Sequence, residues 1–295
     1  MFRRVCFLKV ASEWPADENA LHEKLSEQTF TPCSALSERS FGWEAPVETA
    51  AGTLCRSVAG ADVFQLRTQS RLLPTAAVNE AVEQRIAEFR ERMGEVPGRR
   101  ETRRLKAETR DKLLPKALLR SDRTKALYLR RAGVLAVDAA SPSGIERFVE
   151  HLRLSFGRLE VGELPLHRPV SEFLTRVFLG DAPAGVFPGR ECRMQDPADS
   201  RANVRFADMD LADASVRRHL KDGMALTHLG IEFDNVMTCV LDEKGRIGKL
   251  RIVGLDDEDS QSEDPLVQFD AELVMLSATL EKFCAVLLRA LGGAQ

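Results

Sequence analysis

The 295-residue sequence has no long uncharged apolar run, and no window approaches the roughly 18 residues that mark a membrane-spanning helix. The N-terminal stretch MFRRVCFLKVASEW has a short apolar run that Lys9 interrupts, and no small-residue cleavage site follows it. We therefore expect residues 4–10 to form a strand of the mature protein. A cytoplasmic protein with no membrane partner is the default expectation.

Closely spaced cysteines are also missing. The six cysteines lie at positions 6, 33, 55, 192, 239 and 284, so the CxxC spacing of zinc, redox and haem sites does not occur. Cys6, Cys239 and Cys284 stand within apolar runs, which favours buried free thiols in a reducing compartment. We expect no metal site and no cofactor.

The short motifs of common enzymes are absent as well. None of the five histidines forms HxH, HxxxH or HExxH, and GxSxG, GxGxxG and GxxxxGK[ST] do not occur. A metal-dependent nuclease would need carboxylates and a lysine that converge on a sheet. Asp234, Asp242 and Lys249 are available for this, although Asp242 lies in what the sequence predicts to be a plain turn. We expect no catalytic residue, and a nuclease is the least favoured alternative.

The apolar patterns that are present predict an α+β fold with mixed or antiparallel sheets and flanking helices. Strands are expected at 4–10, 62–73, 133–140, 224–233, 235–242 and 246–254. Helices are expected at 18–30, 75–94, 99–114, 141–157, 170–180, 210–223 and 269–293, with Asp210 as N-cap of the 210–223 helix. The turn-forming residues of 30–46 and 188–199 predict loops.

Two of these helices interrupt the first half of the chain. Residues 75–94 keep an apolar 3.6-residue period, and Gly94, Pro97 and Gly98 break it before the next helix, which Pro115 ends. We expect residues 72–120 to form a projecting helical hairpin, the tip domain. Residues 1–71 with 121–165 would then form a central α+β domain, and residues 166–295 a C-terminal α+β base domain.

Positive charge is concentrated around this hairpin. The whole chain has a net charge of −3, whereas residues 85–131 hold sixteen basic and seven acidic residues, a surplus of +9 that leaves −12 elsewhere. Such a polarised distribution predicts a partner that binds one region of the molecule.

The cations of the second hairpin helix follow one face. At 100° per residue Arg99, Arg103, Lys106 and Arg110 fall within about 60° of arc and cover about 16 Å of helix axis. Glu101 and Glu108 lie on the opposite face. Like charges on one face repel, so the arrangement favours an external polyanion. Duplex DNA offers a phosphate every ~1.7 Å along its axis.

The neighbouring sequence widens this patch without adding groups that read bases. The candidate DNA-binding residues are Arg99, Arg100, Arg103, Arg104, Lys106, Arg110, Lys112, Lys116, Arg120 and Arg123. No Asn, Gln or aromatic residue is interleaved among them, and phosphate contacts carry no sequence code. The pattern predicts non-specific binding to duplex DNA. A solvated charged surface helix, and a binding module for RNA or an acidic protein, are the alternatives.

Several stretches resemble one bacterial family. LLPTAAVNEAVEQRIAEF, PGRRETRRLKAE and LLPKALLRSDRT, together with FTPCSALSERSFGW and the C-terminal FDAELVMLSATLEKFCAVLLRALGG, are similar to the recombination-associated protein RdgC family in collinear order. The resemblance implies a non-catalytic homodimer closed into a ring, whose positive hole encircles duplex DNA without sequence preference. It also implies antagonism of a RecA-type recombinase and association with the nucleoid.

The resemblance further implies a contact between subunits at the tip, through Leu114 and Leu118. The family usually has LLPRAF where this chain has LLPKAL, so Lys116 replaces an arginine and Leu118 an aromatic residue. A leucine buries less apolar area than an aromatic ring. We therefore expect weaker ring closure in this chain.

Overall fold

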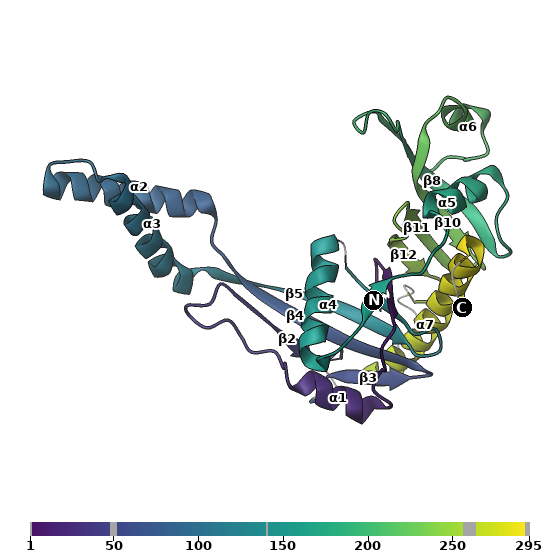
Figure 1. Ribbon diagram of the computed structural model, residues 1–295, viewed down its shortest axis with the longest axis horizontal. Helices are drawn as coiled ribbons and strands as arrows, with labels where there is room; N and C mark the ends of the chain where they lie inside the picture. Colours follow the sequence, from purple (N-terminus) through teal and green to yellow (C-terminus); the bar gives the residue numbers. More distant parts are fainter. Residues whose placement is uncertain (1, 48–51, 140, 256–263, 293–295) are drawn as a thin grey trace. The chain divides into compact units, whose positions relative to one another are not determined.

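The computed structural model describes residues 2–47, 52–139, 141–255 and 264–292 (Figure 1). It has the predicted α+β fold, and the strand pairs within its two sheets are antiparallel. The first half contains β1 (Cys6–Val10), α1 (Glu18–Ser26), β2 (Arg39–Glu44), β3 (Cys55–Val58), β4 (Ala61–Leu72), α2 (Thr75–Met93), α3 (Arg99–Leu113), β5 (Leu118–Leu129), β6 (Val134–Val137) and α4 (Pro142–Phe156). The second half contains β7 (Val161–Glu163), α5 (Val170–Leu179), β8 (Val186–Gln195), β9 (Asn203–Phe206), α6 (Ala214–Lys221), β10 (Ala225–Phe233), β11 (Met237–Asp242), β12 (Ile247–Ile252) and α7 (Pro265–Leu291).

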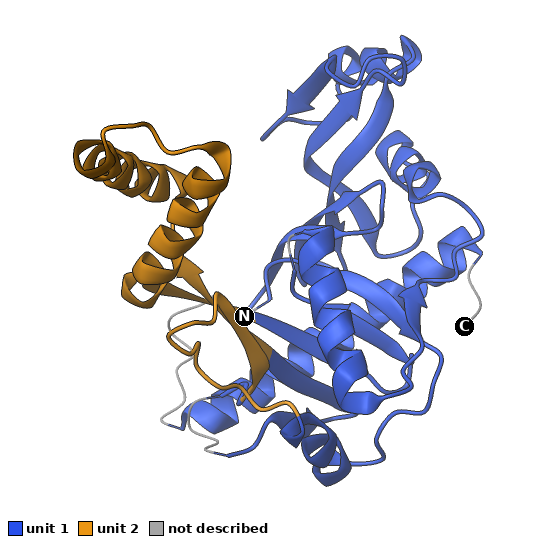
Figure 2. Ribbon diagram, turned by 60° about the vertical axis from the view of Figure 1, so that its left-hand side comes forward, with its two compact units in different colours: residues 1–27, 45–65, 124–295 blue, residues 28–44, 66–123 orange. Residues whose placement is uncertain are grey.

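The chain forms two compact units (Figure 2). Unit 1 consists of Met1–Glu27, Ala45–Gln65 and Thr124–Gln295, and unit 2 of Gln28–Glu44 and Leu66–Arg123. The boundaries fall within β4 and β5, so the predicted hairpin shares its unit with β2 and with parts of two long strands. A compact unit need not fold on its own, so these two units do not test the predicted division into three domains, which stays a prediction.

The seven-stranded sheet has the order β2-β4-β5-β6-β1-β7, with β3 beside β4. All four residues of β6 are buried, so both faces of the sheet are covered at this strand, which pairs with β1 and β5. In unit 1 this sheet contributes Phe7, Val63 and Leu127 to a hydrophobic core that also includes side chains of the second sheet.

The five-stranded sheet lies wholly in unit 1 and has the order β12-β11-β10-β8-β9. Its inward residues, among them Leu229 and Leu241, share the core with Phe173 of α5 and Phe283 of α7. The N-terminal segment extends this sheet beyond β12, because Leu250 N–H donates to the Arg3 carbonyl at 2.9 Å. The outward positions of the strands are mostly polar, which is the alternation expected of a sheet with one face in water.

Two segments that the sequence predicts to be loops contain strands instead. β2 lies within 30–46, and β8 includes Pro188 and Gly189 within 188–199. β8 pairs with both β10 and β9, so long-range hydrogen bonding overrides its turn-forming residues. The N-cap of α6 is Asp213, whose Oδ1 accepts from Ser215 N–H at 2.7 Å, and not Asp210, which accepts from Ala212 N–H in the preceding turn.

Thiol burial agrees with the sequence. All six cysteines are free, five are buried and Cys6 is partly buried. Burial raises the pKa of Cys192 to about 11 and that of Cys239 to about 12, so these thiols stay protonated near neutral pH. Of the helices in the described ranges, none, including the 27-residue α7, combines the length and apolar character needed to cross a membrane.

Candidate nucleic-acid interface

The hairpin of unit 2 consists of α2 and α3 (Figure 2). α2 ends where Gly94 adopts a left-handed conformation with φ of 74°, which glycine tolerates best. α3 follows Pro97 and Gly98 and passes into a single 3₁₀ turn at Leu114–Lys116, where Pro115 prevents further α-helix. Val78 and Val82 of α2 and Leu105 of α3 are buried, while Met93, at the end of the apolar period predicted for residues 75–94, is exposed.

Arg85 of α2 holds the acidic face of α3. Its Nη1 donates to the Leu105 carbonyl at 3.1 Å and to Thr109 Oγ1 at 2.9 Å, and its Nη2 donates to Glu108 Oε2 at 2.8 Å. The hydrogen bond from Arg85, with a second from Arg104, keeps the pKa of Glu108 below its ordinary value. Because α3 is a regular helix, this contact leaves the opposite, cationic face directed away from α2.

Three of the four cations on that face are unneutralised. Arg99, Arg103 and Lys106 are exposed, and their side chains make no ion pair or hydrogen bond with any residue that the structure describes. We call these three residues the α3 cation face. They are seven residues apart at most, so about 10 Å of helix axis presents three uncompensated charges.

The fourth cation, Arg110, has an internal partner. Its Nη2 lies 2.6 Å from Glu38 Oε1, and both side chains are about half exposed. Three further candidates also pair with carboxylates: Arg104 with Glu101 and Glu108, Arg120 with Asp122, and Arg123 with Glu44. Arg120 and Arg123 belong to β5 and not to α3. To contact a DNA phosphate, each of these four arginines would first have to release its carboxylate partner.

The remaining candidates, Arg100, Lys112 and Lys116, are exposed and unpaired within the described part of the chain. Arg100 lies about 100° from Arg99 around the helix and flanks the α3 cation face, whereas Lys112, about 140° away in the other direction, lies beside the acidic face. They can add to the local potential but do not extend the row.

Arg71 organises the segment that follows α3. Its Nη1 donates to the carbonyls of Leu114 and Pro115 at 3.1 and 3.2 Å, and its Nη2 donates to the Ser34 carbonyl at 3.0 Å. Leu114 is 6% exposed and packs inside its own unit, whereas Leu118 is 76% exposed. Of the two residues expected at a subunit contact, only Leu118 therefore offers a free side chain. Their role in a dimer stays a prediction.

The nuclease candidates do not assemble into one site. Asp234 lies in the turn before β11, and Asp242 is the last residue of that strand. The Asp242 carboxylate accepts from Lys244 N–H, Arg246 N–H and Arg246 Nε, while Lys249 Nζ contacts Glu191. Within the described ranges no three His, Cys, Asp or Glu residues are grouped as metal ligands.

Sequence reasoning missed three residues that shape the candidate interface: Glu38, Arg71 and Arg85. Arg85 lies between apolar positions of α2, and the apolar period of that helix does not indicate which α3 residues Arg85 contacts. Glu38 is 72 positions before Arg110, so no local spacing connects them.

Comparison with known proteins agrees with the resemblance seen in the sequence. A family model described as "Putative exonuclease, RdgC" matches residues 1–294. The recombination-associated protein RdgC of Dechloromonas aromatica (strain RCB) is 29% identical over 298 positions, which cover 99% of this chain and 97% of that one. The protein of the same name from Laribacter hongkongensis (strain HLHK9) is 30% identical over 296 positions, with 99% and 98% covered. The chain is a member of the RdgC family.

Proposed function

We propose that this protein binds duplex DNA without sequence preference through the α3 cation face. The observation that carries the proposal is that Arg99, Arg103 and Lys106 share one exposed face and have no carboxylate partner in the described chain. The opposite face of α3 is held by Arg85, so the charges have a fixed direction. A row of uncompensated cations without base-reading side chains suits phosphate contacts.

A triple substitution tests this proposal. We expect Arg99→Gln, Arg103→Gln and Lys106→Gln together to weaken duplex binding at least tenfold at moderate salt, because each phosphate contact releases counterions. The matched control is Lys24→Gln, Arg158→Gln and Lys282→Gln, three exposed cations of unit 1. Equal affinities of the triple variant and the wild type would refute the assignment. Tighter binding of RNA or polyglutamate than of duplex DNA would favour the RNA or acidic-protein alternative.

We further propose that two copies form a ring around the duplex. One α3 presents charge on a single side, whereas phosphates surround the duplex, so a two-fold copy would supply the second row. Leu118 and Leu36 are exposed apolar residues near the Arg71-organised segment and are available for contact with the partner. A ring predicts salt-resistant retention on circular duplex and release from linear duplex. A monomer by light scattering at micromolar concentration would contradict it.

The biological role we propose is competition for DNA with a RecA-type recombinase, without cleavage of the DNA. Relatives named recombination-associated proteins over nearly the full length support the link to recombination. We expect the wild type, but not the triple variant, to inhibit strand exchange in vitro and to co-localise with the nucleoid. We also expect linear duplex to remain intact after incubation with the protein and Mg²⁺. Shortened DNA ends would contradict the non-enzymatic part of the proposal.

A further inference from the structure

A row of chemically different side chains crosses the outer face of the five-stranded sheet. Strand register places Phe187 of β8 opposite Glu232 of β10, Glu232 opposite Thr238 of β11, and Thr238 opposite Arg251 of β12. All four are exposed, and Phe187 is 52% exposed although it is aromatic. Three strand spacings separate the ends of the row by about 14 Å.

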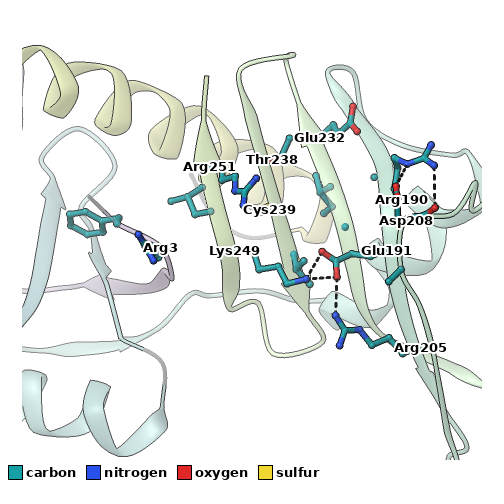
Figure 3. Close-up of a pocket in the computed structure, with 17 residues that line it drawn as sticks. Arg3, Arg190, Glu191, Arg205, Asp208, Glu232, Thr238, Cys239, Lys249 and Arg251 are labelled. Carbon is teal, nitrogen blue, oxygen red and sulfur yellow. Dashed lines mark hydrogen bonds and ion pairs between the residues drawn. The ribbon is translucent and has the colours of Figure 1, made fainter. Parts of the chain in front are cut away.

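Glu232, Thr238 and Arg251 of this row line a hollow of about 1040 Å³ (Figure 3), and Phe187 lies outside the lining, beside Glu232 in the strand register. Part of its lining is bare backbone at Gly189 and Gly230. A Cβ on Gly189 would lie 3.1 Å from the carbonyl carbon of Gly230, and one on Gly230 would lie 3.1 Å from the Glu191 carbonyl oxygen. The close approach of β8 and β10 therefore requires glycine at both positions, and it leaves this part of the lining without side chains. Register shifts in β10 and β11 beside the hollow show that the sheet is locally irregular there.

Most basic side chains that line the hollow form ion pairs within the described ranges, but those of Arg3 and Arg251 do not. Lys249, a non-glycine residue with φ of 50°, reaches Glu191 Oε1 at 2.7 Å, and Arg205 Nη2 lies 3.8 Å from Glu191 Oε2. Arg190 pairs with Asp208 at 2.7 Å. The side chains of Arg3 and Arg251 make no hydrogen bond or ion pair with the described residues, and both line the hollow beside β12 (Figure 3).

The order of groups along the row matches the order of groups in a nucleotide. An exposed aromatic ring can stack on a base, and a carboxylate can accept hydrogen bonds from ribose hydroxyls. A threonine hydroxyl can donate or accept, and arginine is suited to phosphate. Solvent-facing sheets commonly carry charges. What indicates a ligand is the spatial order of the four groups across the strands: an aromatic ring, a carboxylate, a hydroxyl and, at the hollow, an unpaired guanidinium.

We propose that the outer face of this sheet binds a ribonucleotide, with its base on Phe187, its sugar hydroxyls on Glu232 and its phosphate on Arg251 and Arg3. The nucleotide is either free in solution or one unit of single-stranded RNA, since both present the same groups. This site is separate from the α3 cation face and goes beyond the proposed binding of duplex DNA.

Calorimetric titration of the full-length protein with ATP and with dATP tests the site. We expect saturable binding of ATP, with weaker binding of dATP because Glu232 loses the 2′-hydroxyl. Arg3→Gln with Arg251→Gln should weaken ATP binding about tenfold or more, since charge-assisted contacts to phosphate are lost. Glu232→Gln should reduce the preference for ATP over dATP. Arg158→Gln, an exposed arginine outside the hollow, is the control and should bind as the wild type does.

A second titration with pentauridylate distinguishes the two sources of the nucleotide. It is performed with the Arg99, Arg103 and Lys106 triple variant as well as with the wild type. The comparison separates RNA binding by α3 from RNA binding by the outer face of the sheet. Binding of ATP alone assigns a free nucleotide, and binding of pentauridylate that depends on Arg3 and Arg251 assigns RNA. Absence of saturable binding of both probes, or equal affinity in the Arg3 and Arg251 variant, would overturn the proposal.

Discussion

Arg110 differs from the other cations on its face of α3 because it already has an anionic partner. The Arg110 Nη2 to Glu38 Oε1 distance of 2.6 Å places a carboxylate where a phosphate would otherwise bind. Both side chains are about half exposed, and exposed ion pairs contribute little to stability. The pair therefore costs little to break, and in the proposed complex Glu38 would compete with DNA for Arg110.

We predict that Glu38→Gln tightens duplex binding by a few-fold, because an exposed ion pair is worth at most about 1 kcal/mol. Fluorescence anisotropy with a labelled duplex measures the change. Glu91→Gln is the matched control, since Glu91 is an exposed glutamate of α2 without a basic partner in the described residues. An equal gain in both variants would show that overall charge, and not release of Arg110, explains the effect.

At the scale of elements, the direction of α3 depends on how α2 holds it. Arg85 is three-quarters covered and bonds to a carbonyl, a hydroxyl and a carboxylate of α3. We predict that Arg85→Leu lowers the free energy of unfolding by about 1–3 kcal/mol, since buried acceptors lose their donor. Denaturant titration measures this change, and hydrogen exchange should rise within residues 99–113. Unchanged exchange there would mean that apolar packing alone positions α3.

The connection between the two helices gives a second prediction with an internal control. Gly94 has φ of 74°, whereas Gly98 has φ of −66°, and an added Cβ would meet no atom at either position. Gly94→Ala should destabilise the protein by about 1 kcal/mol, because a side chain disfavours the left-handed conformation. Gly98→Ala should lower the melting temperature less, because its φ suits alanine and only the preference for glycine at the N-cap of α3 is lost. Equal shifts would contradict the conformational explanation.

The hairpin could be predicted because its signals are local. The apolar period of α2 and the breaks at Gly94, Pro97 and Pro115 predict both helices, and the i, i+4 spacing of Arg104 and Glu108 indicates their ion pair. β8 could not be predicted in this way, because Pro188 and Gly189 are typical of loops and β8 pairs with β10, whose residues lie 30 to 47 positions from their β8 partners along the chain. The same holds for the row from Phe187 to Arg251, which exists only through strand register.

For the molecule as a whole, charge is divided between the two units. Unit 2 holds sixteen basic and eleven acidic residues, a net charge of +5, so unit 1 carries −8 of the total −3. An anionic polymer is therefore attracted to unit 2 and repelled by the average field of unit 1. This division agrees with the placement of the α3 cation face in unit 2.

Acid should destabilise unit 2 through two glutamates. Burial acts to raise the pKa of Glu44, but hydrogen bonds from Arg123 and Arg67 outweigh it and keep the pKa below the ordinary value. The pKa of Glu108 is also lowered, chiefly by Arg85. Acids with lowered pKa stabilise the fold above their unfolded pKa, about 4.5, and this contribution is lost as pH falls through the folded pKa. We predict no such loss between pH 7 and 5 and a falling denaturation midpoint below pH 4.5. In Glu44→Gln the fall should be smaller.

The salt dependence of duplex binding tests the central claim most directly, because it counts phosphate contacts. For the wild type, the logarithm of the association constant should fall linearly with the logarithm of salt concentration. Removal of Arg99, Arg103 and Lys106 should reduce the magnitude of the slope by about 2.7, at roughly 0.9 for each lost contact. The triple control of Lys24, Arg158 and Lys282 should keep the wild-type slope. An unchanged slope in the α3 variant would contradict the claim that these three cations meet phosphates.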